Sequence, residues 1–241
     1  MKSNRFELVS RGFLELGVES NYINLTCIEK VALLKSSVAQ DRTLGARLLA
    51  CDGGAAVYDL VQALTVEKKL YPKIEICNTL VTLGEVAVKP LIVQLGRIGS
   101  NQHNDLPSKA FGKESYPLPR DIAARTLAHI GKEALPDLLK VLEEDNLSKL
   151  SEAIDAIGYI CYYNHQPEVF EKLKSCYKFN ADNNLISWKL IRAMSGFPES
   201  IEFLMEQRTI CDNSMVKQEI DRSIRLINKR KDSIGVHSIS Q

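Results

Sequence analysis

The side chains that most often carry catalysis are scattered through this chain. His103 and Asp105 lie close together, but they stand in a polar stretch without helical periodicity. Two ligands on such a stretch do not make the convergent set that a metal ion requires. The six cysteines form no CxxC pair, and the sequence has no phosphate-binding loop, nucleophile elbow or HExxH motif. We therefore expect no catalytic residue, no metal and no cofactor.

Composition narrows the classes of partner. The 241 residues are 45% hydrophobic and carry a formal net charge of +1, so no overall field attracts nucleic acid or an acidic membrane. No apolar run approaches the length of a membrane span, and Glu7, Arg11 and Glu15 interrupt the apolar residues at the start of the chain. We expect a cytoplasmic protein that neither enters a membrane nor binds nucleic acid. In such a protein, scattered cysteines are expected to be small buried apolar residues rather than disulfides.

Three glycines anchor a repeated pattern of apolar residues. Counted from Gly53, Gly84 and Gly131, apolar side chains recur at +3, +4, +7, +8 and +11. This spacing places them on one face of an α-helix. The three sets are Ala56, Val57, Leu60, Val61 and Leu64; Ala87, Val88, Leu91, Ile92 and Leu95; and Ala134, Leu135, Leu138, Leu139 and Leu142.

A second helix precedes each glycine. Leucine stands four residues before each one, and Asp41, Pro72 and Pro119 supply helix-start signals further upstream. Each unit is thus predicted to be a helix, a tight glycine turn and a second helix. The residue after each start signal is basic, in the series Arg42, Lys73 and Arg120. These cations are interpreted as partners of acidic groups on adjacent helices rather than as a phosphate track.

The pattern resembles the HEAT repeats, and most closely the short HEAT-like repeats of the phycobilisome-lyase type. The resemblance implies an all-α fold, an α-solenoid of about six antiparallel helix pairs plus a C-terminal capping helix. It also implies that the second helices line a concave face. We expect one domain over residues 1–230 and a flexible tail over residues 231–241. The capping helix is predicted over 215–227.

Residues 99–117 form an insertion between the second and third glycine units. The interval from Gly84 to Gly131 is longer than that from Gly53 to Gly84, and the excess falls in this polar stretch. It contains two aromatic residues, Phe111 and Tyr116. Such insertions are either tolerated, mobile spacers or partner-binding loops, and both interpretations stay open.

Non-core positions of the second helices are the candidate binding surface. They mix charges of both signs with apolar and aromatic side chains, which suits a protein partner. The leading hypothesis is therefore a non-catalytic scaffold that binds another protein. The candidate partner-binding residues, with the two loop aromatics, are Tyr58, Asp59, Gln62, Lys89, Val93, Lys140, Phe111 and Tyr116.

The alternative is an enzyme or lyase subunit, because families that the chain resembles attach bilins or remove alkylated bases from DNA. A glycosylase of this kind would need aromatic residues and a carboxylate in a positively charged cleft. Tyr58 and Asp59 offer the first two features, but no basic residues surround them in the pattern. Trp188, the only tryptophan, is predicted to fill the core rather than to stack on a base.

Overall fold

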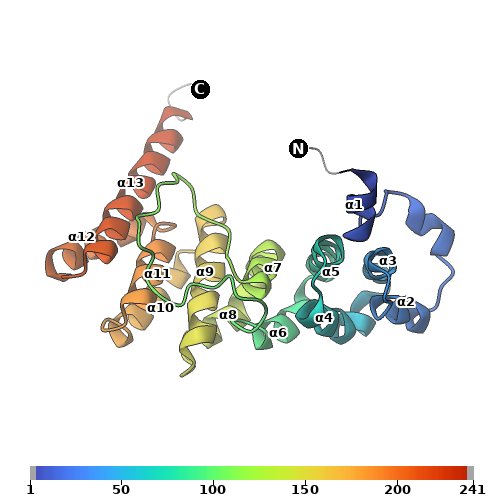
Figure 1. Ribbon diagram of the computed structural model, residues 1–241. Coiled ribbons are helices and arrows are strands. Elements are labelled where there is room, and N and C mark those ends of the chain that lie inside the picture. Colours follow the sequence, from blue (N-terminus) through green and yellow to red (C-terminus); the bar gives the residue numbers. More distant parts are fainter. Residues whose placement is uncertain (1–3, 238–241) are drawn as a thin grey trace. The chain divides into compact units, whose positions relative to one another are not determined.

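The computed structural model describes the backbone of residues 4–237 and the side chains of residues 4–230. Residues 4–237 form thirteen α-helices, four short 3-10 helices and no strand (Figure 1), which confirms the predicted all-α class. No helix in this part of the chain is both long and apolar enough to cross a membrane. The chain divides into two compact units, Met1–Gly99 and Ser100–Gln241, where the sequence predicts one domain.

The first unit consists of helices that pack on one another. Helix α3 packs against α2 and α5, and α4 packs against α5 and α6. The bounds are α1 (Arg5–Ser10), η1 (Val18–Tyr22), α2 (Cys27–Leu34), α3 (Ala39–Leu49), η2 (Gly53–Ala56), α4 (Val57–Val66), α5 (Leu70–Leu83) and α6 (Glu85–Val93).

The second unit repeats the same alternation. Helices α7, α9, α11 and α13 pack in succession, while α8, α10 and α12 pack on α9, α11 and α13 respectively. The bounds are α7 (Ile122–Ile130), η3 (Lys132–Ala134), α8 (Leu135–Val141), α9 (Leu147–Tyr163), α10 (Glu168–Phe179), α11 (Asn184–Met194), η4 (Pro198–Ser200), α12 (Ile201–Ile210) and α13 (Ser214–His237).

The three anchor glycines all have positive φ angles, of 60° at Gly53, 65° at Gly84 and 93° at Gly131. Gly84 and Gly131 are the C-caps of α5 and α7, whereas Gly53 lies three residues after Ala50, the C-cap of α3, and begins η2. Positive φ costs an L-residue steric strain, so glycine is required at these turns. The apolar positions counted from them are buried, except for Leu139 and Leu142, which are half-buried. Helix α8 ends at Val141, so its buried stripe is Leu135, Leu138 and Val141 instead.

The helix ends differ from the predicted ones. Helices α3 and α5 begin at Ala39 and Leu70, each two residues before its start signal, whereas α7 begins at Ile122, after its N-cap Asp121. Proline is tolerated anywhere in the first turn of a helix, because the N–H groups there make no intrahelical hydrogen bond. The position of a proline therefore does not determine at which residue the helix begins. Helix α13 continues to His237, past the predicted domain end at 230, and residues 238–241 of the predicted tail lie outside the described residues.

Candidate functional site

The predicted surface of the second helices is exposed in both units, considered separately. In the first unit Tyr58 is 74% exposed and Val93 53% exposed, and Gln62 and Lys89 are exposed as well. In the second unit Lys140 is exposed beside Asp137, with Nζ 2.7 Å from Oδ1. The geometry thus leaves these positions free for a partner.

A groove of about 680 Å³ runs along α4 in the first unit. Asp59, Gln62 and Val66 line one side of it, and Val66 is 73% exposed. The basic side chain of Arg42 lies at its edge and binds Glu67 in a bidentate pair, with N–O distances of 2.7 and 3.0 Å. This pair confirms the structural interpretation of Arg42.

Residues 100–120, here named the strap, form no helix and lie across the second unit (Figure 1). The strap is docked on the helices, so the mobile-spacer interpretation does not hold for it. Tyr116, a predicted partner-binding residue, is only 3% exposed. Its hydroxyl lies against Gly158, whose missing side chain makes the space. Phe111 is half-buried, with its ring 5.2 Å and 4.9 Å from the guanidinium carbons of Arg192 and Arg222.

Beneath the strap lies a row of buried charges that sequence reasoning missed, here named the charge ladder. Each of three successive packed helices, α9, α11 and α13, contributes two charged side chains spaced three residues apart, and all six are at most 4% exposed. Three are acidic and three are basic, so the charges compensate one another. The ladder consists of Glu152, Asp155, Lys189, Arg192, Glu219 and Arg222.

Lys189 is the centre of the ladder's first half. Its ammonium donates to Glu152 Oε1 at 2.9 Å and to the carbonyl of Ser151 at 3.2 Å, and lies 2.8 Å from Asp155 Oδ2. These three acceptors use all three N–H donors of the ammonium. Within the described residues, the second oxygens of both carboxylates, Glu152 Oε2 and Asp155 Oδ1, accept no hydrogen bond.

The second half of the ladder holds the strap. Arg192 and Arg222 share one carboxylate oxygen, Glu219 Oε1, at 3.3 and 2.6 Å. Arg222 also donates to two strap carbonyls, those of Lys113 at 3.1 Å and Ser115 at 2.8 Å. The guanidinium carbon of Arg192 lies 3.7 Å from the centre of the Trp188 ring, so the buried tryptophan, predicted to be core, also forms a cation–π contact.

Burial shifts the protonation of two groups in this region. Desolvation, reinforced by Asp155 and only partly offset by Lys189, raises the pKa of Glu152 from 4.5 to about 7. Desolvation, together with the positive charges of Lys189 and Arg120, lowers the pKa of His103 to about 4. His103 is therefore a neutral ring at neutral pH, and Glu152 exchanges a proton near neutrality.

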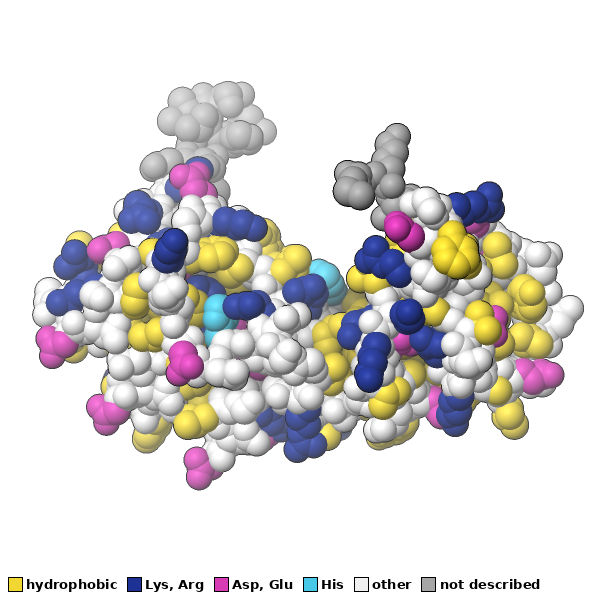
Figure 2. Space-filling model, viewed as in Figure 1, with side chains coloured by type: hydrophobic (Ala, Val, Ile, Leu, Met, Phe, Trp, Pro, Cys, Tyr) yellow, Lys and Arg dark blue, Asp and Glu magenta, His cyan; other side chains and the backbone are white. Residues whose placement is uncertain are grey.

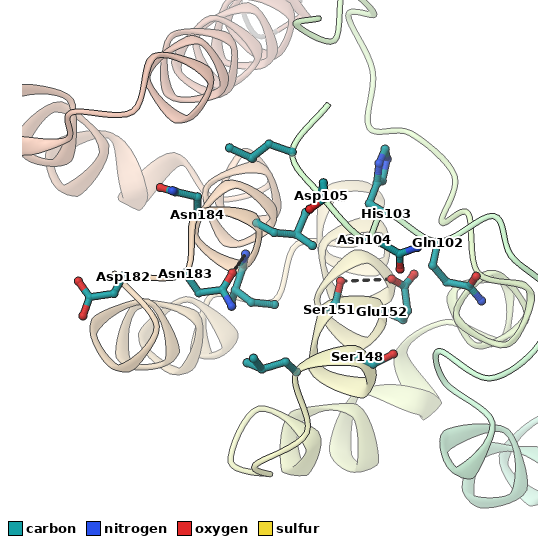
Figure 3. A pocket seen from close by; sticks show the side chains of 14 residues that line it. Gln102, His103, Asn104, Asp105, Ser148, Ser151, Glu152, Asp182, Asn183 and Asn184 are labelled. Atoms are coloured by element: carbon teal, nitrogen blue, oxygen red, sulfur yellow. Dashed lines mark hydrogen bonds between the residues drawn. The ribbon is translucent and has the colours of Figure 1, made fainter. Parts of the chain in front are cut away.

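His103 of the strap lines two of the cavities in the second unit. The carboxylate cavity, of about 880 Å³, is lined by Asp105, Glu152 and Asp182 among several amide side chains (Figure 3). The aromatic cavity, of about 600 Å³, contains rings, one carboxylate and several cations. Its lining includes Phe111, Tyr116, Trp188, Asp155, Arg192, Lys109, Lys113 and Arg120.

The local chemistry does not reveal a nucleophile or a metal site. Burial raises the pKa of Cys161 to about 12 and that of Cys176 to about 11, so both thiols stay protonated at neutral pH. Cys51 is exposed, against the prediction of buried cysteines, and all six are free thiols. In the part of the chain that the structure describes, no group of three His, Cys, Asp or Glu side chains converges as metal ligands do.

A sequence signal for the charge ladder does exist. "SEAIDAIGY" and "SWKLIRAM" each place two charges of the same sign three residues apart within an otherwise apolar or small-residue helix. Such charges on the inward face of a helix need partners on the next helix. In comparisons with known proteins, the chain matches no protein-family model and no curated protein sequence.

Proposed function

We propose that this chain is a non-catalytic scaffold that binds another protein on the exposed face of its second helices. The observation that carries the proposal is the division of α4 into two faces. Leu60 and Leu64 are fully buried, whereas Tyr58 and Val66 are 74% and 73% exposed. Tyr58, Gln62 and Val66 follow one another at helical spacing, so they form a single stripe beside the groove. Exposed aromatic and branched side chains beside a groove are typical anchors of protein interfaces.

The proposal includes an α-solenoid of HEAT-like repeats that works in the cytoplasm. It is supported by the positive-φ glycines between the paired helices and by the alternating helix contacts inside each unit. The binding surface mixes Lys35, Lys68 and Lys69 with Asp59 around the groove. In Figure 2 charges of both signs are interspersed with hydrophobic side chains, which suits a protein partner better than a phosphate backbone.

Site-specific photo-crosslinking tests this proposal. A photoreactive phenylalanine at Tyr58 or Gln62 is expected to capture one partner protein in cells. The matched control position is Ile74, which is 44% exposed. It lies in the same unit on α5, which is the first helix of its predicted pair and not a second helix. Equal capture from Ile74, or no capture from Tyr58 and Gln62, would show that this face binds no protein.

The aromatic cavity favours a second candidate, a glycosylase-like enzyme acting on alkylated DNA bases. Such an enzyme needs aromatic rings and a carboxylate near cations, and the strap and the charge ladder bring these together around Trp188, Asp155 and Arg192. The groove beside Tyr58 and Asp59, the pair suggested by the sequence, has basic side chains but no aromatic ring among the described residues that line it. A carboxylate stabilises the positive charge that develops on a sugar as its glycosidic bond breaks.

Release of modified bases from alkylated duplex DNA is the direct assay of the second candidate. If it is correct, the wild-type chain releases bases and Asp155→Asn loses most of the activity. Asp137→Asn, on α8 outside the aromatic cavity, should retain it. No release by the wild-type chain rejects the glycosylase.

A further inference from the structure

The carboxylate cavity is unlike the rest of the surface in its charge. Three carboxylates line it, and no lysine or arginine does, although the chain has 31 of these two residues. Its remaining polar lining consists of amides, serines and His103, which is neutral at neutral pH. A cavity with this lining attracts a cation and offers many acceptors to hydrogen-bond donors.

One of the carboxylates is buried and lacks a donor. Glu152 is 1% exposed, and its Oε1 receives Lys189 Nζ at 2.9 Å and the hydroxyl of Ser151 at 3.2 Å. Oε2 receives nothing from the described residues. Lys189 cannot serve it, because its donors are used on Ser151, Glu152 and Asp155. A buried carboxylate oxygen without a donor costs free energy, which a donor from a ligand would recover.

The other two carboxylates lie on different walls of the cavity. Asp105 belongs to the strap, and Asp182 belongs to the connection between α10 and α11 (Figure 3). Both are exposed, and within the described residues neither has an ion-pair partner. The three carboxylates do not converge as metal ligands. Charges spread over about 880 Å³ suit an extended organic cation with several charged groups instead.

Apolar side chains between the carboxylates define the rest of the ligand. Leu106, Leu147, Leu185 and Ile186 line the same cavity. They can contact the methylene groups of an alkyl chain, as aliphatic surfaces do with lysine stems. We propose that the carboxylate cavity binds an aliphatic ligand with primary ammonium groups, either a free polyamine or a lysine side chain of a partner protein. One ammonium donates to Glu152, and the others lie near Asp105 and Asp182.

Titration calorimetry at physiological ionic strength tests the proposal with two probes. Spermidine represents the free polyamine, and a tetralysine peptide with blocked ends represents a partner's side chains. Tighter binding of spermidine assigns a small-molecule ligand, and tighter binding of the peptide assigns a protein source, which rests on the scaffold proposed above. The same peptide with acetylated lysines has no charge and should not bind.

Variants on the exposed wall test the site without disturbing the core. Asp105→Asn combined with Asp182→Asn should weaken spermidine binding by about fivefold or more, since each removes an attractive charge. Asp212→Asn, an exposed carboxylate outside the cavity, should leave it unchanged. The proposal is overturned if neither probe binds at millimolar concentration, or if the double variant and Asp212→Asn bind alike.

Proton release gives an independent readout. An ammonium beside Glu152 favours the ionised carboxylate, so binding near pH 7 should release a proton, seen as a buffer-dependent heat. The charged groups acting on Glu152 are Asp121, Asp155 and Lys189, and Glu152→Gln should abolish the release. Binding without proton release would place the ammonium away from Glu152 and contradict that part of the proposal. The crosslinking at Tyr58 is scored separately, so either proposal can fail alone.

Discussion

The hydroxyl of Tyr116 lies where a side chain on Gly158 would be: a β-carbon added to this glycine would stand 2.0 Å from the oxygen. The same β-carbon would stand 2.9 Å from the Cα of Ala193 on α11. Glycine within α9 therefore lets both the strap and the neighbouring helix approach closely. This one residue couples the packing of α9 and α11 to the docking of the strap.

Gly158→Ala should destabilise the protein. Alanine favours a helix interior over glycine by about 1 kcal/mol, but overpacking against two neighbours costs about 1–3 kcal/mol. Because one of the contacts is with backbone, which cannot move aside easily, we expect the overpacking cost to exceed the gain in helix propensity. The free energy of unfolding measured with urea should fall by about 1–2 kcal/mol. Gly112→Ala in the strap is the control, since its β-carbon would meet nothing within 4 Å. A Gly158→Ala protein as stable as wild type would contradict the close approach.

Tyr116→Phe should leave stability unchanged or raise it by about 1 kcal/mol. The Tyr116 hydroxyl is buried and finds no hydrogen-bond partner among the described residues, so removing it removes an uncompensated desolvation cost. Urea denaturation measures the difference. Tyr177→Phe, another buried tyrosine, gives the comparison for loss of a hydroxyl elsewhere in the second unit. A clear loss of stability in Tyr116→Phe would reveal a bond to that hydroxyl.

Glu152→Gln should change how stability depends on pH. The pKa of Glu152 is raised from 4.5 to about 7, so the folded state holds a proton that the unfolded state releases in this window. Its contribution to stability is present below pH 4.5 and is lost as pH rises toward 7, by an amount on the order of 3 kcal/mol. Glu152→Gln should therefore gain stability relative to wild type between these pH values.

The pH dependence of stability must be compared between wild type and Glu152→Gln, because His103 changes the stability of both in the opposite sense. Its pKa is lowered from 6.5 to about 4, so its contribution is lost as pH falls through that range. In wild type, between pH 4.5 and 6.5, the free energy of unfolding falls with pH because of Glu152 and rises with pH because of His103, so the two effects offset each other. Subtracting the unfolding free energies of the two proteins cancels the His103 slope. A difference that stays constant with pH would show that Glu152 is not perturbed.

Arg222→Ala should open the strap. The side chain donates to the carbonyls of Lys113 and Ser115, and its loss also leaves the shared Glu219 with one guanidinium fewer. We expect trypsin to cleave after Lys109 and Lys113 several-fold faster than in wild type. Arg225→Ala is the matched control, because Arg225 is exposed on the same helix and makes neither bond. Equal cleavage rates in the two variants would argue against this anchor.

Leu138→Asp tests the repeat register. Leu138 is fully buried, so an unpaired carboxylate there should cost several kcal/mol and lower the thermal midpoint sharply. Lys140→Asp lies two residues away on the exposed side of α8 and loses only the surface pair with Asp137, which we expect to cost less than about 1 kcal/mol. Similar midpoints for the two variants would mean that the assigned faces of α8 are incorrect.

The glycine-punctuated pattern was readable because it is local. Burial at Leu60 or Leu91 follows from spacing along one helix, and positive φ at Gly84 follows from the turn that joins two helices. The ends of the helices were not readable, since Pro72 can occupy any position of the first turn. Local periodicity therefore predicts which residues face the core better than it predicts where a helix starts.

The candidate site depended on contacts that periodicity does not encode. Arg222 meets strap carbonyls 107 and 109 residues earlier in the chain, and nothing in the spacing near either residue indicates that pairing. Tyr116 looks like an exposed aromatic because its neighbours are polar, and only the space at Gly158 reveals where it goes. The sequence of α11 alone suggests that a charged residue such as Lys189 faces solvent. The packing of α9, α11 and α13 together buries it.

The long separation between the strap and Arg222 has a consequence for synthesis. Chains grow from the N-terminus, so the strap leaves the ribosome well before the residue that anchors it. A nascent chain lacking Arg222 leaves the carbonyls of Lys113 and Ser115 without this donor and Phe111 without one of its two guanidinium contacts. The strap therefore reaches its docked position only after α13 has been synthesised, so the second unit cannot complete its packing while its N-terminal part is emerging.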